Sequence, residues 1–135
     1  MARVLIVDDE QTDRVILGYI VKRTGREVYF ASDGEQALET YLKNSIEIII
    51  TDLVEFIEAV RTLFPEVPII AVSGEGPDLL AAAKRMGAFA TFRKPIDPHE
   101  LVEALENATS TWLSRAAPKR RRLGAEIEKE SDRYG

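Results

Sequence analysis

The segment from Ile46 to Leu53 constrains the fold more than any other part of the sequence. It reads Ile-Glu-Ile-Ile-Ile-Thr-Asp-Leu, and its apolar β-branched residues are typical of a strand buried on both faces of a parallel sheet. The run ends in a single acid, Asp52. Open α/β sheets bind ligands just outside the carboxyl ends of their strands. We therefore expect Asp52 to lie where such a protein does its chemistry.

The composition favours one cysteine-free domain. A chain of 135 residues, 45% of them hydrophobic, can bury one core of ordinary size. Without cysteine it forms neither disulfides nor thiolate metal sites, which fits a reducing compartment. No apolar run approaches the roughly 20 residues of a membrane span, and Asp8 and Asp9 interrupt the short apolar run at the amino terminus, unlike a signal peptide. We expect a cytoplasmic protein without a membrane partner.

The net charge is unevenly distributed along the chain. Residues 114–135 contain seven Lys or Arg and four acids, a net of +3, so the −5 of the whole chain leaves −8 on residues 1–113. A body this acidic would repel nucleic acid, and we expect no nucleic-acid binding by it. We interpret 1–113 as one domain and 114–135 as a charged carboxyl-terminal extension or linker, too short for a DNA-binding domain.

Strand and helix patterns alternate along the domain. Val15, Ile16, Tyr19 and Ile20 have the spacing of a helix with one buried face, and Ser32 with Glu35 predicts a capping box at the second helix. Strands are expected at 3–7, 27–31, 46–52, 67–72 and 88–93, and helices at 12–23, 32–42, 53–64, 76–86 and from 97 onward. Short connections between such units require a parallel sheet covered on both faces. The predicted fold is α/β, a doubly wound five-stranded parallel sheet of order 2-1-3-4-5, as in flavodoxin.

This strand order would bring several reactive side chains to one edge of the sheet. Strands one and three would be neighbours, so Asp8, Asp9 and Asp52 would converge. Three carboxylates this close repel one another unless a cation joins them, and Mg²⁺ prefers such oxygens. The next two strands lead to Ser73 and Lys94. Each residue alone is commonplace, but a carboxylate nucleophile, a metal, a hydroxyl and an ammonium together indicate phosphoryl transfer.

Five motifs resemble the receiver domain of two-component response regulators. They lie between Arg3 and Ala108 and read Val-Leu-Ile-Val-Asp-Asp-Glu, Ala-Ser-Asp-Gly-Glu-Gln-Ala-Leu, Ile-Ile-Thr-Asp-Leu, Val-Pro-Ile-Ile-Ala-Val-Ser-Gly and Arg-Lys-Pro-Ile. The resemblance implies that Asp52 accepts a phosphoryl group from a phosphohistidine of a partner histidine kinase or phosphotransfer protein. It also implies that Mg²⁺ is bound by Asp52, by Asp9 directly and by Asp8 with the help of water.

The same resemblance implies the roles of the remaining site residues. Ser73 would reach the phosphoryl group and carry the switch, Lys94 would pair with the phosphoaspartate, and the bond between Lys94 and Pro95 would be cis. Phosphorylation would then shift the face formed by the fourth helix, fifth strand and fifth helix, which would gain or lose a downstream effector or a second copy of the chain. Such a domain is not a conventional enzyme, although Mg²⁺-dependent self-phosphorylation and self-dephosphorylation are expected.

The sequence departs from the family after Asp52. The usual Met-Pro-x-x-Asp-Gly loop is missing, and Leu53 and Val54 lead directly into a helical pattern. Compared with the spacing usual in the family, roughly seven residues are missing here. Connections between a strand and a helix of this type normally have about 2 to 6 residues. We expect so short a reversal to be awkward. Either these residues are naturally deleted, or the molecule contains a loop here that this sequence lacks. The intact strand pattern before the gap and the intact helix pattern after it favour a loop that this sequence lacks. The gap leaves Val54 unassigned where the family has a carbonyl metal ligand, and it admits an alternative function, a receiver-like interaction module that is not phosphorylated.

A second departure lies at Thr91, where many family members carry an aromatic switch residue. Phe89 and Phe92 flank this position. A two-residue period predicts Phe89 and Thr91 on one face of the sheet and Phe92 on the other. We interpret both phenylalanines as core residues.

Overall fold

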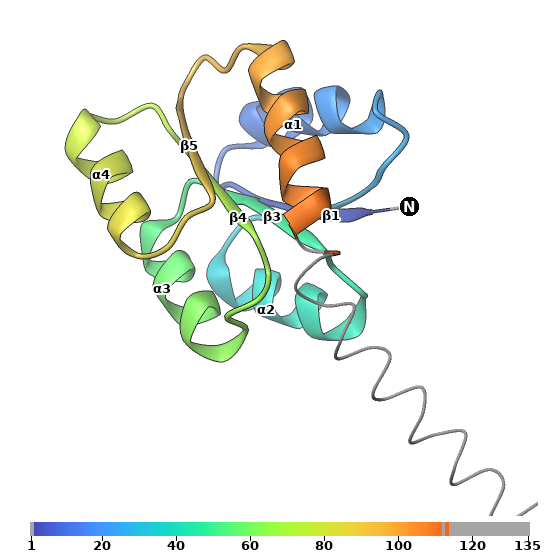
Figure 1. Cartoon of the computed structure of the whole chain (residues 1–135), viewed down its shortest axis with the longest axis horizontal. Helices are drawn as coiled ribbons and strands as arrows, with labels where there is room; N and C mark the ends of the chain where they lie inside the picture. The colour runs from blue at the N-terminus through green and yellow to red at the C-terminus, as the bar shows by residue number, and fades with distance from the viewer. Residues whose placement is uncertain (1, 112, 114–135) are drawn as a thin grey trace, which may run out of the picture.

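The fold is described by a computed structural model, which covers residues 2–111 and 113. Five parallel strands form one sheet of order β2-β1-β3-β4-β5 (Figure 1), as predicted. The strands are β1 (Arg3–Val7), β2 (Glu27–Ala31), β3 (Ile48–Thr51), β4 (Ile69–Ser73) and β5 (Ala90–Arg93). The helices are α1 (Gln11–Lys22), α2 (Gly34–Lys43), α3 (Val54–Leu63), α4 (Pro77–Arg85) and a carboxyl-terminal helix over residues 98–111. None of the helices in this part of the chain is long and apolar enough to cross a bilayer.

Two apolar cores lie on opposite faces of the sheet. Ile48 and Ile50 of β3 pack in the core beneath α1 and the carboxyl-terminal helix. Ile49 packs on the other face, beneath α2, α3 and α4. All three isoleucines are fully buried. Because both faces of β3 are covered, its sequence is a continuous apolar run rather than an alternating one.

The buried face of α1 differs from the predicted one. Leu17, Gly18 and Val21 are its buried residues, whereas Val15, Ile16 and Tyr19 are more than half exposed. The helix carries apolar residues on more than one side, so their spacing is compatible with two different buried faces. The predicted face has more large side chains, but the structure buries the face that contains Leu17 and Val21.

The start of α2 lies one residue from the predicted cap. Asp33 is the N-cap, and its Oδ1 accepts a hydrogen bond from the Gln36 N–H at 2.8 Å. Ser32 instead donates its backbone N–H and its hydroxyl to Oε1 of Gln36, at 2.7 and 3.0 Å. Both Ser and Asp cap helices well, and Gln can replace Glu three residues later, so the capping pattern fits this sequence in two registers.

The connection between β3 and α3 consists of Asp52 and Leu53 alone. Leu53 has an extended backbone, with φ −94° and ψ 99°, and its N–H donates to Oγ1 of Thr51 at 3.0 Å. No non-glycine residue of the described chain has a positive φ. The expectation of an awkward reversal is therefore wrong, because ordinary backbone conformations close it. A natural deletion is compatible with this fold, and an intact mass of 15.1 kDa would establish it.

The two phenylalanines near β5 both pack against the core beneath α1 and the carboxyl-terminal helix. The prediction that they lie on opposite faces is wrong for Phe89, because β5 begins only at Ala90 and the two-residue period does not extend back to it. Thr91 pairs with Ala71, which belongs to the opposite core. Both phenylalanines are partly buried against the core, as interpreted.

Candidate functional site

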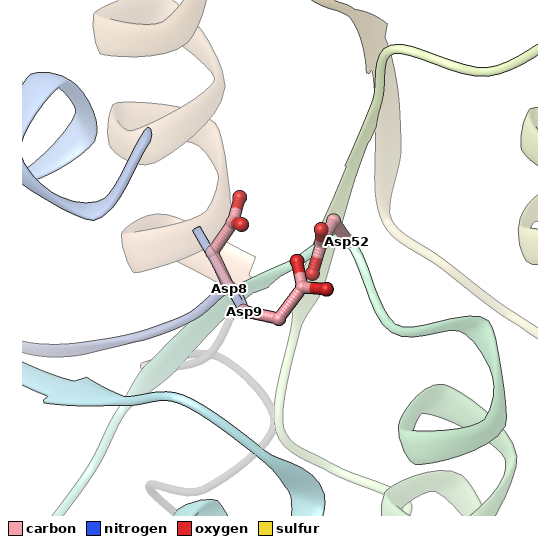
Figure 2. A group of neighbouring side chains, drawn as sticks. All are labelled: Asp8, Asp9 and Asp52. Atoms are coloured by element: carbon pink, nitrogen blue, oxygen red, sulfur yellow. The ribbon is translucent and has the colours of Figure 1, made fainter. Parts of the chain in front are cut away.

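The parallel register brings three acids to one edge of the sheet. Val7, the last residue of β1, pairs with Thr51, the last residue of β3. The residues that follow these strands are therefore neighbours, and the Asp52 N–H donates to the Val7 carbonyl at 3.2 Å. Asp8, Asp9 and Asp52 each offer a carboxylate oxygen within 4.8 Å of the other two, and Figure 2 shows the three side chains grouped at the strand ends.

The three acids have different surroundings. Asp8 is 0% exposed, and its Oδ1 accepts from the Glu10 N–H at 2.9 Å. Asp9 is exposed. The side chain of Asp52 is 17% exposed, and its Oδ1 is buried without a hydrogen-bond partner among the described residues. A carboxyl group that has a buried oxygen without a partner among the described residues, and that lies beside two further carboxylates, fits a site for a hard cation such as Mg²⁺.

The protonation of Asp52 reflects this crowding. Burial raises the pKa of Asp52 to about 7, and repulsion from Asp8 and Asp9 acts in the same direction against the attraction of Lys94. Without a cation, this carboxyl group therefore holds its proton to a higher pH than an ordinary aspartate does. A divalent cation among the three acids would favour its ionised form.

Lys94 lies among the acids, in the segment that follows β5. Its Nζ is 2.7 Å from Oδ2 of Asp8, 2.8 Å from Oδ2 of Asp13 and 3.6 Å from Oδ2 of Asp52. Partial burial acts to lower the pKa of Lys94, but the hydrogen bonds to Asp13 and Asp8 outweigh it and raise the pKa above its ordinary value. The peptide bond between Lys94 and Pro95 is cis. Lys94 therefore places a charged ammonium group 3.6 Å from the carboxylate of Asp52.

Ser73 ends β4 at the same edge of the sheet. It is 4% exposed, and its carbonyl accepts from the Lys94 backbone N–H at 2.8 Å. Its Oγ accepts from the Glu75 N–H at 3.0 Å. Since a hydroxyl group both donates and accepts, this bond leaves the Ser73 hydrogen free to donate to a ligand.

The structure places one residue that the sequence left unassigned and adds one that the sequence did not indicate. Val54, left unassigned, is the first residue of α3, so its carbonyl takes part in helix hydrogen bonding rather than lying in a loop. Asp13 was missed altogether. It lies in the first turn of α1 and not at a strand end, so no strand pattern marks it. Only the contact with Lys94 identifies Asp13 as part of the site.

An apolar groove lies between α1 and the carboxyl-terminal helix, which are next to each other in Figure 1. At the end near the site, its lining residues Val15 and Ile96 lie two positions along the chain from Asp13 and Lys94. Its volume is about 1010 Å³. Its apolar lining includes Val15, Ile16, Tyr19, Ile20, Ile96 and Val102. Val15, Ile16 and Tyr19, which were predicted on the buried face of α1, therefore form one wall of this open surface, whereas Ile20 also packs against the core as predicted.

Comparison with protein families agrees with the motifs. The family model described as the response regulator receiver domain matches residues 4–106. Sporulation initiation phosphotransferase F of Bacillus subtilis is 25% identical over 112 residues, which cover 77% of this chain and 90% of that protein. A putative NtrX-like response regulator of Rickettsia bellii is 30% identical over 115 residues, covering 78% of this chain. The matched region is 24% of that relative, so this chain spans about a quarter of its length.

Solved structures have the same fold. The chemotaxis protein CheY4 of Vibrio cholerae superposes with a TM-score of 0.72 at 31% identity, covering 80% of this chain and 98% of that one. A response regulator receiver domain protein from Clostridium thermocellum superposes with a TM-score of 0.75 at 27% identity, covering 82% and 95%. With most of its length matched by the family model, the chain belongs to the response regulator receiver domain family, the phosphorelay receivers of two-component systems.

Proposed function

We propose that Asp52 accepts a phosphoryl group from the phosphohistidine of a cytoplasmic histidine kinase or phosphotransfer protein. The observation that carries this proposal is the grouping of three carboxylates, one of which has a buried oxygen that no described residue hydrogen-bonds. In the transfer, a carboxylate oxygen of Asp52 bonds to phosphorus as the nitrogen–phosphorus bond of the donor breaks, and the imidazole is left neutral after taking up a proton. An unphosphorylated interaction module is not favoured, because the full set of acids, hydroxyl and ammonium is present.

Asp8, Asp9 and Asp52 would hold Mg²⁺, which supplies neutralising charge for the carboxylates and the phosphoryl oxygens. The hydroxyl of Ser73 would donate to a phosphoryl oxygen, and the ammonium of Lys94 would pair with the phosphoaspartate. Drawing these two residues inward would change the face formed by α4, β5 and the carboxyl-terminal helix, to which a downstream effector or a second copy of the chain would bind. We propose residues 1–113 as the receiver unit; the proposed extension, 114–135, lies outside the described residues.

Acetyl phosphate tests the acceptor chemistry without a partner protein. Incubation with Mg²⁺ should add the mass of one phosphoryl group to the intact protein, and EDTA should prevent the addition. Hydroxylamine, which cleaves acyl phosphates, should remove it. If the mass does not change in Mg²⁺, the proposal fails and the unphosphorylated module becomes the better account of the site.

The stability of the Mg²⁺-free protein should depend on pH through Asp52. Its pKa is raised from 3.8 to about 7 on folding, so the folded state binds this proton more tightly than the unfolded state does. Between about pH 4 and pH 7 the group is protonated when folded and ionised when unfolded, so its contribution to the free energy of unfolding falls as pH rises through this window. Because Mg²⁺ competes with the proton, it should raise the melting temperature more at pH 8 than at pH 5. Equal shifts at the two pH values would contradict this linkage.

The groove beside the site is proposed to contact the phosphohistidine donor. Helix α1 begins at the site, where Asp13 reaches Lys94, so a protein that brings a histidine to Asp52 would also cover the exposed face of α1. Ile16→Glu should therefore slow phosphoryl transfer from a phosphorylated histidine phosphotransfer protein by about tenfold or more, since a buried charge replaces an apolar contact.

The same variant should react with acetyl phosphate at the parent rate, because Ile16 belongs neither to the group of three acids nor to the residues paired with Lys94. Leu42→Glu is the matched control: Leu42 is also an exposed apolar residue, 65% exposed against 53% for Ile16, and it lies on α2 at the other face of the sheet. Protein-dependent transfer that is slowed equally by both substitutions would contradict a donor contact at the groove.

A further inference from the structure

Asp13 is a charged contact of the site for which the proposed chemistry has no role. Its carboxylate does not belong to the group of three that could hold a metal ion. It is 27% exposed, projects from the first turn of α1 and forms a hydrogen-bonded ion pair with Lys94 at 2.8 Å. The geometry therefore ties Lys94 to α1, away from the strand that carries Asp52.

The distances around Lys94 show which carboxylates hold it. Its ammonium group makes short charge-assisted hydrogen bonds to Asp8 and Asp13, at 2.7 and 2.8 Å. The distance to Asp52 is 3.6 Å, beyond hydrogen-bond range. Lys94 is thus attracted by Asp52 but not bonded to it. The bonds to Asp8 and Asp13 use two of the three N–H donors and hold the ammonium group at 3.6 Å from Asp52, so they oppose its movement toward a phosphoryl group there.

Binding of a cation at the site would affect Asp8 and Asp13 differently. Asp8 belongs to the proposed metal site, where a cation would take part of its charge and weaken its hold on Lys94. Asp13 lies outside that group, so a cation bound there would not weaken its hold on Lys94 in the same way. It is therefore the carboxylate that continues to oppose the movement of Lys94 toward Asp52.

We infer that Asp13 is a positioning residue that holds Lys94 away from Asp52 in the unphosphorylated protein and so limits how readily the phosphorylated arrangement forms. This inference rests on the proposed function of Asp52 and Lys94. Lys94 must loosen its bond to Asp13 to reach phosphoryl oxygens, so the ion pair stabilises the resting arrangement relative to the phosphorylated one. Removing the charge of Asp13 shifts this balance toward the phosphorylated arrangement.

Beryllofluoride, which mimics a phosphoryl group on a carboxylate, measures the balance by titration calorimetry at saturating Mg²⁺. Asp13→Asn should bind it about threefold to tenfold more tightly than the parent, the range expected for one partly exposed ion pair. Asp13→Glu keeps the charge and should bind like the parent. Glu10→Gln is the matched control, because it removes a nearby exposed charge at the start of α1 and Glu10 is not among the carboxylates that contact Lys94.

Two further measurements separate a role through Lys94 from a general change of charge or structure. In a Lys94→Met background, Asp13→Asn should change the affinity no more than Glu10→Gln does. In the parent background, the ¹⁵N resonance of the Lys94 ammonium group should shift in Asp13→Asn and not in Glu10→Gln.

The possible results separate the inference about Asp13 from the proposed function of Asp52. If the parent does not bind beryllofluoride in Mg²⁺, the proposed function fails and the inference fails with it. If the parent binds but Asp13→Asn matches Glu10→Gln, the inference alone is overturned. An effect of Asp13→Asn that persists without Lys94 overturns it as well.

Discussion

Asp52→Asn is expected to abolish phosphorylation by acetyl phosphate. The amide keeps the shape of the side chain but lacks the anionic oxygen that attacks phosphorus, and it contributes one neutral oxygen to the metal site in place of a carboxylate. Intact mass after incubation with Mg²⁺ measures the modification, and ¹H–¹⁵N correlation spectra with and without beryllofluoride measure the response of the fold. The variant should show neither change.

Glu55→Gln is the matched control for this substitution. Glu55 is an exposed acid in the first turn of α3, so its replacement removes the same charge close to the site without removing the proposed acceptor. It should be phosphorylated and should respond to beryllofluoride like the parent. A phosphorylated Asp52→Asn variant would mean that another residue accepts the group.

Asp52→Asn should also stabilise the protein against unfolding in EDTA. Burial and the neighbouring acids raise the pKa of Asp52, which means that its ionised form is unfavourable in the folded state. Replacing it by a neutral amide should therefore increase the free energy of unfolding at pH 8 by on the order of 1 to 2 kcal/mol. Urea denaturation in EDTA measures the gain. A loss of stability would mean that attraction to Lys94 outweighs burial and repulsion.

The sequence was sufficient for the fold and for most of the site, for identifiable reasons. The unbroken apolar run of β3 required a strand covered on both faces, and the alternation of strand and helix patterns left few topologies. Once the strands are parallel, the residues just after them share one edge of the sheet. From that rule alone Asp8 and Asp52 are predicted to be neighbours, and the register of β1 on β3 confirms it.

The sequence did not predict which face of a helix is buried or at which residue a helix begins. The apolar residues of α1 fit two faces, and only packing against the sheet decides that Leu17 and Val21 are buried. Asp13 is one of many acids in the chain, and its contact with Lys94 depends on how α1 is rotated about its axis. The cap of α2 was ambiguous by one residue because Ser32 and Asp33 are both good caps. In each case several local choices agree with the sequence, and tertiary contacts select one.

Lys94→Met should have the opposite effect on stability to Asp52→Asn. Asp8 is fully buried, and Lys94 is the cation hydrogen-bonded to its carboxylate. Removing one partner of a buried ion pair costs about 3 to 5 kcal/mol, and since Lys94 is 19% exposed we expect about 2 to 3 kcal/mol in EDTA at pH 8. Methionine retains most of the apolar stem, so the loss reports the missing charge. Urea denaturation measures it.

Mg²⁺ should restore most of the stability that Lys94→Met loses, because a cation among the three acids replaces the charge that the lysine supplied. The variant should therefore respond more strongly to Mg²⁺ than the parent does, even though it lacks the ammonium group that would pair with a phosphoryl group. Lys84→Met, at an exposed position in the last turn of α4, is the matched control and should change neither the stability in EDTA nor the response to Mg²⁺. If both variants lose the same stability, or if Mg²⁺ does not rescue Lys94→Met, then Lys94 does not balance the charge of these carboxylates.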